Sequence, residues 1–403
     1  MSLGDRARKA LSKPSPYGVD IDVSSYAIEE PQVFEELQVE RGVEEAVESK
    51  IGVRPSMSQY LQLGQSAFYK LMEKSLEKYG VKVMPLRVAI GKFDIVRDMA
   101  WRLVEPDTDK YTALTYIYGG ELGYFVYVPP GVKVPTPIYT CLVLRAERRA
   151  MLAHNVVYVD EGAEAHVVTG CTIPHGVKGG LHVGISEFYV GRGSRLTFSM
   201  IHSWAEGLHI RPRTAVKVAE GGEYVSYYVI YSPVSSIQLF PRTILDRGAR
   251  LHAASVIAGR AQGNYDVGTK AQLEGAGSSA EIVSRVVAFE DSKIYARGDV
   301  EGLAPDSRGH IECLGLLASP NATISSIPIV TSRNPQSTLS HEAAIGIIAR
   351  EEIEYLESKG FTEDEAKSII IRGFMSIEPP GIPDMVRAQV KRLIDHIARA
   401  GGL

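Results

Sequence analysis

The sequence predicts a mainly β protein built around a parallel β-helix, with α-helical segments at both ends. Two observations indicate this fold class. Short runs of β-branched and aromatic residues alternate with glycine-centred turns through the middle of the chain. These turns recur at a steady interval, and an apolar residue stands three positions after each of them. We expect a mainly helical region over 1–110, a β-helix over 111–332 and a C-terminal helical domain over 333–403.

The N-terminal region carries the spacing of an α-helix. Apolar residues of the stretch 68–79 recur every three or four positions, as on one face of a helix, and Gly80 follows as a C-terminal cap. These residues are Phe68, Met72, Leu76 and Tyr79. The stretch 31–50, rich in Glu and Val, predicts a second helix.

The glycine turns define the repeat of the middle region, with an interval of about 30 residues. A glycine that tolerates positive φ, followed by a strand at a long and steady period, is typical of a solenoid whose stacked coils bury a shared apolar face. A β-sandwich would turn every ~8–12 residues, and an unrelated all-β fold with common glycine turns is the alternative. The turn glycines are Gly131, Gly162, Gly193, Gly222, Gly248 and Gly277, and Asp291 and Asn321 place turn residues at later positions.

Three helices are predicted after the repeat. The first has an apolar face from Ile345 to Leu356 and ends at Gly360. A second begins with the capping box formed by Thr362 and Glu365. Its apolar stripe comprises Ala366, Ile369, Ile370, Gly373 and Phe374. A last amphipathic helix covers 386–397.

Composition narrows the function classes. The formal net charge is −4, so no basic field indicates a nucleic-acid partner. No apolar run has the roughly 18–20 residues that cross a bilayer, and the first residues lack a signal-peptide core, so we expect a cytoplasmic protein without membrane contacts. The three cysteines form no CxxC pair, which disfavours a zinc ribbon or thioredoxin motif.

Several motifs are incomplete. His341 and Glu342 begin like a zinc-protease motif, but Ile345 replaces the second histidine. His310 begins an H-x-E sequence without the cysteine pair of zinc deaminases. The sequence also lacks a P-loop, so we expect any ATP-driven step to come from a partner.

Eight segments, in order from about residue 110 to the end, resemble the SufB/SufD family of iron–sulfur cluster assembly scaffolds. They are 123–132, 159–174, 181–182, 201–204, 266–270, 310–317, 339–346 and 354–360. The resemblance implies a right-handed parallel β-helix that dimerises through its core. It also implies a SufC-type ABC ATPase that docks on the C-terminal helices. The residues expected to bind this partner are Leu356, Gly360, Phe361, Ile369, Ile370, Gly373 and Phe374.

The resemblance also assigns candidate site residues. It maps the sulfur-accepting and cluster-assembly cysteine onto Cys313, and the family's further ligands onto His341 and Glu342. The interval between Cys313 and His341 is close to one coil of the repeat, which predicts that they stack. Cys171 is implied as a second sulfur-accepting residue. Arg145, His202 and Trp204 are expected to line the same passage, with His202 where the family often has Gln.

We expect Cys141 to have a structural role. It lies one position further from its turn glycine than Cys171 lies from the next turn glycine. A one-residue offset turns a side chain to the opposite face of a strand. We therefore expect that Cys141 and Cys171 do not stack as a pair.

The favoured hypothesis is an assembly scaffold rather than an enzyme. It would accept sulfur derived from a cysteine desulfurase, carry a transient iron–sulfur cluster, and act as a homodimer or with a SufB/SufD paralogue. Use of a reduced flavin stays open. One alternative is a SufD-like structural subunit without sulfur chemistry, although such chains usually lack a cysteine at position 313. An alternative of another class is a β-helix carbohydrate-active enzyme or acyltransferase.

Overall fold

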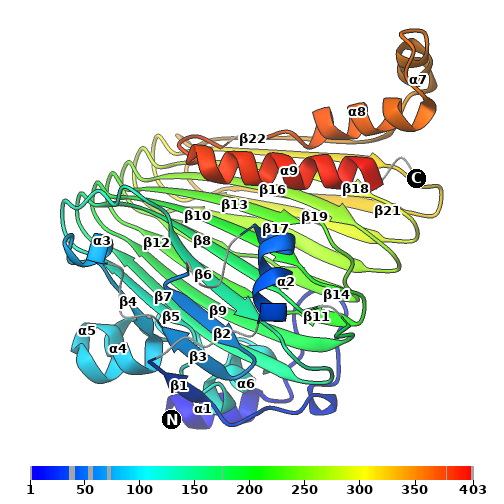
Figure 1. The fold of residues 1–403 in the computed structure, drawn as a ribbon. Helices are drawn as coiled ribbons and strands as arrows, with labels where there is room; N and C mark the ends of the chain where they lie inside the picture. The colour runs from blue at the N-terminus through cyan, green and yellow to red at the C-terminus, as the bar shows by residue number, and fades with distance from the viewer. Residues whose placement is uncertain are drawn as a thin grey trace.

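The chain forms a parallel β-helix with helices packed around it, which confirms the predicted fold class (Figure 1). The computed structural model describes residues 2–35, 41–52, 58–69, 74–174, 176–377 and 379–400. Two 11-stranded sheets face each other across the core. Within the described residues, no helix is long and apolar enough to cross a membrane.

Sheet 1 contains β1 (Gln32–Phe34), β3 (Ser66–Tyr69), β2 (Tyr60–Leu63), β6 (Ile138–Val143), β8 (Glu164–Thr172), β10 (Arg195–Ser203), β13 (Glu223–Ile230), β16 (Arg250–Gly259), β18 (Ser279–Ala288), β20 (Arg308–Leu317) and β22 (Thr338–Ile347). Sheet 2 contains β4 (Lys82–Pro85), β5 (Tyr124–Val128), β7 (Ala150–Val159), β9 (Gly180–Val190), β11 (Leu208–Ile210), β12 (Arg213–Val218), β14 (Ser236–Leu239), β15 (Arg242–Leu245), β17 (Asn264–Leu273), β19 (Lys293–Gly302) and β21 (Thr323–Ser332). The helices are α1 (Leu3–Ala10), α2 (Arg41–Ile51), α3 (Lys74–Glu77), α4 (Leu86–Lys92), α5 (Asp94–Met99), α6 (Lys110–Tyr118), α7 (Arg350–Glu357), α8 (Glu363–Met375) and α9 (Asp384–Ala400), with a short 3₁₀ helix at Val23–Ser25.

Each coil contributes strands to both sheets, and the register confirms the repeat. Ser279 pairs with Arg308, and Arg308 pairs with Thr338, so successive coils have nearly the same length. Five of the six predicted glycines have positive φ; in the fourth turn this residue is Gly221 rather than Gly222. Asp291 and Asn321 precede strands of sheet 2, so they lie at the opposite edge from the glycine turns.

The N-terminal region differs from the helical prediction. Phe68 lies in β3, which pairs with β1 and β2, so sheet pairing overrides the helical spacing. Met72 lies outside the described residues, and the helix that remains is the short α3 before Gly80. The stretch 31–50 contains β1 before α2, and its residues 36–40 also lie outside the described ones.

The boundaries of the β-helix also shift. Its successive coils begin with β5, after α6, and continue to Ile347 rather than ending at 332, and β2 adds an earlier strand that pairs in parallel with β6. Ile345 therefore belongs to β22, and the first C-terminal helix begins only at Arg350. The capping box of Thr362 and Glu365 is present at the start of α8, as predicted.

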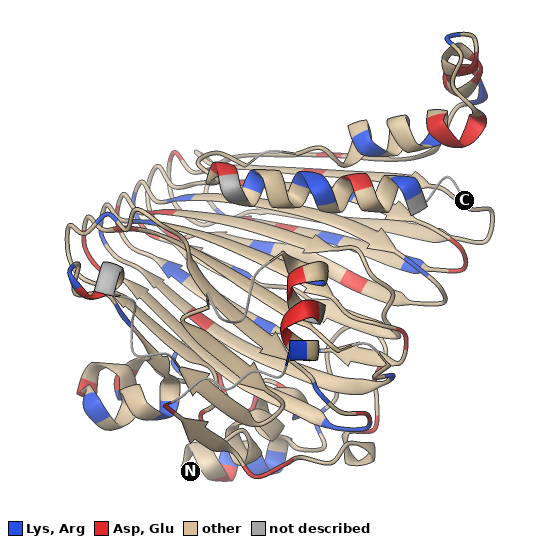
Figure 2. Cartoon of the chain, in the orientation of Figure 1, with Lys and Arg blue, Asp and Glu red and all other residues tan. Residues whose placement is uncertain are grey.

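Helices cover the outer faces of both sheets. Apolar residues of α2 and α9 pack on the outside of sheet 1, whereas α4 and α6 pack on sheet 2. α7 and part of α8 project away from the body of the β-helix (Figure 1). Charged residues lie on the helices, in the turns and on several strands (Figure 2). The inward side chains of the two sheets form one large apolar cluster, so polar side chains inside it stand out.

Candidate functional site

The three cysteines lie on two different faces of sheet 1. Cys171 and Cys313 point into the β-helix, whereas Cys141 belongs to the apolar layer on the outer face. Cys141 pairs with Gly170, and Cys171 pairs with Leu142, so the two cysteines do not stack. This confirms the prediction from their one-residue offset. Burial raises the pKa of the Cys141 thiol to about 12, consistent with a structural residue.

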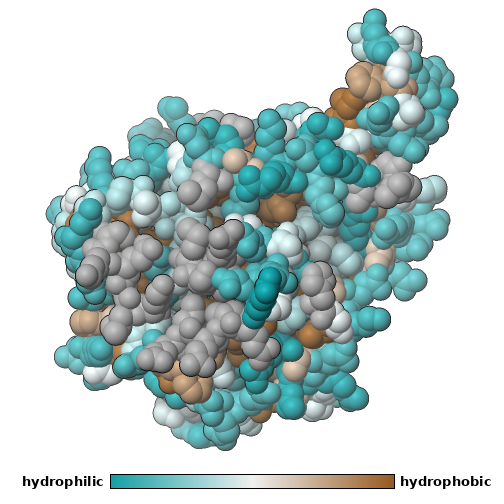
Figure 3. Space-filling model, in the orientation of Figure 1, coloured by the Kyte–Doolittle hydropathy of each residue, from teal (hydrophilic) through white to brown (hydrophobic). Residues whose placement is uncertain are grey.

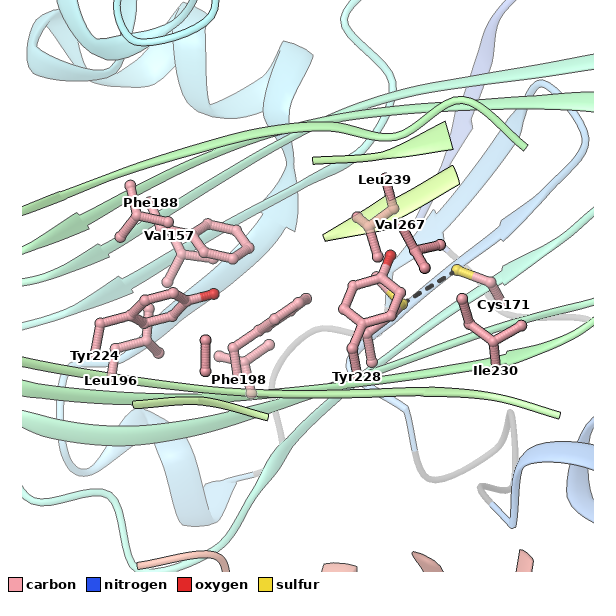
Figure 4. Close-up of a cluster of buried hydrophobic side chains, with 14 of the residues drawn as sticks. Val157, Cys171, Phe188, Leu196, Phe198, Tyr224, Tyr228, Ile230, Leu239 and Val267 are labelled. Carbon is pink, nitrogen blue, oxygen red and sulfur yellow. Dashed lines mark hydrogen bonds between the residues drawn. The ribbon is translucent and has the colours of Figure 1, made fainter. Parts of the chain in front are cut away.

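Cys171 lies in the core on β8, next to a second sulfur atom (Figure 4). Its Sγ is 3.6 Å from Met200 Sδ, to which the thiol donates a hydrogen bond. Burial raises the pKa of Cys171 well above its usual value, so the thiol is protonated at neutral pH.

His202 and Trp204 form a hydrogen-bonded chain beside Cys171, on the neighbouring strand. Trp204 Nε1 donates to His202 Nδ1 at 2.6 Å. Because indole nitrogen only donates, His202 carries its proton on Nε2 and donates it to the Tyr228 hydroxyl at 2.8 Å. Burial lowers the pKa of His202 well below its usual value, so this imidazole is neutral. A neutral imidazole can donate one hydrogen bond and accept another at the same time.

Arg145 is not part of this cluster. It is exposed in the loop after β6, whereas His202 and Trp204 are buried in the interior. The structure therefore does not bring the three predicted passage residues together.

One inward-facing row links the surroundings of Cys171 to Cys313. Consecutive strand pairings align Met200 with Tyr228, then Ser255, Ser284 and Cys313. The hydroxyls of Ser255 and Ser284 are 2.9 Å apart. Four strand spacings of about 4.8 Å place Cys313 roughly 19 Å from Met200 along the row.

Sequence reasoning missed the three hydroxyl residues of this row, Tyr228, Ser255 and Ser284. Their spacing was the signal that could have found them. Counted back from Cys313, each lies close to one coil length before the next.

Cys313 lies near the end of the β-helix and its side chain is 2% exposed. Burial raises the pKa of its thiol to about 11, and the nearby Ser326 hydroxyl offsets a smaller part of this shift. The predicted stacking with His341 is wrong: Cys313 pairs with Ala343, because this coil is two positions longer than the interval between Cys313 and His341. His341 pairs with Ile311, two positions away along the strand and so on the same inward face.

Glu342 faces the opposite way. It pairs with Glu312 on the outer face of sheet 1, where Glu312 contacts Arg285. Within the described ranges, no group of three His, Cys, Asp or Glu side chains is arranged to hold a metal ion. A single chain thus brings Cys313 and His341 to one face at the same end of the β-helix, without Glu342.

This end of the β-helix is open. The residues of β22 are mostly exposed, whereas the inward residues of β20 are buried. Exposed apolar side chains mark the end: Ile329 (46%), Ile345 (42%) and Ile347 (73%). The last coil therefore presents apolar side chains and strand edges that the described part of its own chain leaves uncovered.

The predicted partner-binding residues lie on α7, α8 and the loop between them. Gly360, Phe361 and Gly373 are exposed, and the others are partly buried: Leu356, Ile369, Ile370 and Phe374. α8 turns Ala366, Ile371 and Met375 inward instead. Tyr355 on α7 is 62% exposed, and apolar residues gather on one side of the projecting segment (Figure 3).

A family model matches most of the β-helix and the two helices α7 and α8 that follow it. Residues 142–374, more than half of the chain, match the profile described as "SUF system FeS cluster assembly, SufBD core domain". An iron–sulfur cluster assembly SufBD family protein of Methanothermobacter thermautotrophicus is 38% identical over 401 residues, covering 97% of each chain. One from Archaeoglobus fulgidus is 40% identical over 364 residues, covering 89% of this chain and 96% of its own.

A bacterial relative is more distant. The iron–sulfur cluster assembly protein SufB of Bacillus subtilis is 29% identical over 359 residues, covering 86% of this chain and 76% of its own. The core match and the two archaeal relatives show that this chain belongs to the SufBD family of the SUF iron–sulfur cluster assembly system.

Proposed function

We propose that this protein is the scaffold subunit on which a transient iron–sulfur cluster is built, with Cys313 as the sulfur-accepting residue. The observation that carries the proposal is the position of Cys313. It is buried beside the open end of the β-helix and is joined to the surroundings of Cys171 by one inward row. The protein would act as a cytoplasmic scaffold, and ATP hydrolysis would come from a SufC-type partner.

The chemistry of cysteine suits this role. A thiolate can carry sulfur as a persulfide and is a preferred ligand of iron–sulfur clusters. Since burial raises the pKa of Cys313 to about 11, sulfur acceptance requires a step that exposes or deprotonates this thiol. Movement at the open end, driven by the ATPase partner, would supply that step.

At each cysteine the step would be the same: the thiolate attacks the outer sulfur of a donor persulfide, a new S–S bond forms, and the donor leaves as a thiolate. Cys171 and Cys313 would both accept sulfur in this way, and the inward row joins their surroundings. The hydroxyls of Tyr228, Ser255 and Ser284 lie between the two cysteines on this row, and His202 with Trp204 would fix the Tyr228 hydroxyl. Arg145 is left out of the passage because it is exposed.

The open end supports dimerisation with a second copy or a paralogue. Burying this end would bring Cys313 and His341 of both subunits to one interface, with Glu342 on its outer side.

Replacing Ile329 and Ile345 by lysine should convert the dimer to a monomer, because two charges would have to be buried in the interface. Light scattering after size exclusion measures this. Ile95→Lys, at a 53% exposed position on α5, is the matched control and should remain dimeric. An unchanged mass for the double variant would place the dimer interface elsewhere.

Persulfide mapping tests the proposed function. The protein is incubated with a cysteine desulfurase and cysteine, and mass spectrometry then locates sulfur on each thiol. We expect a persulfide on Cys313 and none on Cys141. Sulfur on neither Cys313 nor Cys171 would favour the alternative, a SufD-like structural subunit.

A further inference from the structure

The N-terminal segment 14–22, called the strap below, has no regular secondary structure. It runs from α1, which packs on α6, towards the bridge between Ala27 and Arg149, and it contacts the outer face of sheet 2 through Gln238 of β14. None of its residues is buried. A segment that buries so few side chains opens at low free energy while the elements at its two ends stay in place.

Three cationic side chains surround the aromatic ring of Tyr111, on α6 under the strap. Lys110 Nζ lies 5.5 Å from the ring centroid, and the guanidinium carbons of Arg211 and Arg213 lie 5.4 Å and 5.3 Å from it. Arg213 has a counter-charge, because its Nε is 2.7 Å from the buried Asp109 carboxylate. This cluster therefore holds three positive charges against one buried carboxylate.

Arg211 lacks a counter-charge of its own. It is fully buried, and no carboxylate of the described residues lies within ion-pair distance of it. It donates to neutral acceptors, which include the Ser236 carbonyl at 3.2 Å and the Ser236 hydroxyl at 2.8 Å. Its Nε has no hydrogen-bond partner in the described part of the chain. Because a buried charge without a counter-charge is costly, a carboxylate brought to Arg211 would stabilise this site.

The strap occupies the cluster as an extended acidic peptide would. The backbone carbonyl of Val19 accepts a hydrogen bond from Arg211 Nη2 at 3.0 Å, and that of Ile21 accepts one from Lys110 Nζ. The Asp20 carboxylate between them lies 2.7 Å from Lys110 Nζ. It is 52% exposed and pairs with Lys110 rather than with Arg211, so the strap leaves the buried charge of Arg211 uncompensated.

We propose that the strap is an internal occupant of a peptide-binding site, and that an extended acidic segment of a partner protein displaces it. Any extended peptide supplies the two carbonyls, and its acidic side chains supply the charge. A partner with a second carboxylate near Arg211 would accept a charge-assisted hydrogen bond where the strap offers only a carbonyl, so it would bind better than the strap does. The inference does not involve the cysteines and stands independently of the proposed function.

Gly18 offers a way to open the strap without changing the cluster. Its φ is 66°, and an added Cβ atom would lie 2.9 Å from the Gln238 side chain. Since residues other than glycine rarely adopt this conformation, Gly18→Val should shift the strap towards its open state. A thermal melt checks that the variant keeps the fold.

Fluorescence anisotropy with a labelled peptide of residues 14–24 tests the proposal on the full chain. We expect the peptide to bind Gly18→Val at least about tenfold more tightly than the unchanged chain, in which the strap competes. An Asp20→Asn peptide should bind at least about tenfold more weakly. In the Gly18→Val background, Lys110→Gln should weaken binding as much, whereas Lys92→Gln, at the exposed end of α4, should leave it unchanged.

A second peptide identifies the class of occupant. Replacing Val19 and Ile21 of the labelled peptide by threonine keeps its backbone and both aspartates. We expect this peptide to bind within about tenfold of the strap peptide, because recognition uses the carbonyls and the carboxylate.

Four results would overturn the proposal. Binding to Gly18→Val that is no tighter than to the unchanged chain would show that the strap does not occupy the site. Peptide binding that survives Lys110→Gln would place the site elsewhere. Binding by the exact strap sequence alone would make the occupant the strap of a second copy of this chain. Calorimetric binding of pyrophosphate to Gly18→Val, without binding of either peptide, would make the cluster a small-anion site.

Discussion

Replacing Glu187 by alanine is expected to destabilise the protein by about 3–5 kcal/mol, the range found when one partner of a buried ion pair is removed. The Glu187 carboxylate is fully buried on β9. It accepts hydrogen bonds from the backbone N–H groups of Trp101 at 2.6 Å, Leu103 at 2.5 Å and Val104 at 3.0 Å. His154 Nε2 donates a fourth at 2.8 Å. Alanine would leave these buried donors without an acceptor.

His154 makes this cluster dependent on pH. Burial alone would lower its pKa, but the hydrogen bonds to Glu121 and Glu187 outweigh burial and raise the pKa to about 9. A raised pKa stabilises the fold fully below the unfolded value of about 6.5, and the contribution is lost as the pH rises through 9. The stability difference between the protein and Glu187→Ala should therefore shrink over this pH window.

Urea unfolding followed by circular dichroism measures both effects. Glu281→Ala is a matched control, because Glu281 also accepts from a histidine, His252, at 3.1 Å but is 54% exposed. The control should change the free energy of unfolding by less than about 1 kcal/mol. A loss below about 1 kcal/mol for Glu187→Ala would contradict the role of this cluster in fixing residues 101–104.

Replacing both Tyr355 and Phe361 by aspartate should weaken binding of the SufC-type ATPase at least about 30-fold. The two aromatic side chains are 62% and 41% exposed, and buried aromatic anchors typically contribute at least about 2 kcal/mol each to an interface. Neither supports the β-helix, so the fold should persist.

Biolayer interferometry with the ABC-type ATPase of the same SUF system gives the affinities. Ile95→Asp changes a similarly exposed apolar residue on α5 and should bind normally. If the double variant and the control bind alike, the ATPase docks on another surface.

The fold was largely predictable because a coil of nearly constant length leaves its period in the sequence. Glycine positions with positive φ, such as Gly131 and Gly162, recur with that period whatever residues occupy the strands. Helical spacing was less reliable in the N-terminal region. Phe68 satisfies a helix pattern, yet β3 pairs with two strands that local sequence does not reveal.

The candidate site was predictable only in part. Family resemblance singled out Cys313, and the alternation of a strand placed Cys141 and Cys171 on opposite faces. The strand pairing of Cys313 and His341 could not be read from their spacing, because coil lengths vary slightly. An error of one residue in the coil length changes which residues pair between neighbouring strands. For the same reason, the sequence did not reveal that Glu342 pairs with Glu312 on the neighbouring strand.

Anaerobic reconstitution with iron and sulfide tests the central claim, that Cys313 holds the growing cluster, most directly. The protein should develop the visible absorbance of an iron–sulfur cluster, and Cys141→Ala should develop it too. Cys313→Ala should remain colourless while keeping the circular dichroism spectrum of the folded β-helix. A Cys313→Ala variant that reconstitutes with the same spectrum and the same iron content would contradict the assignment of Cys313.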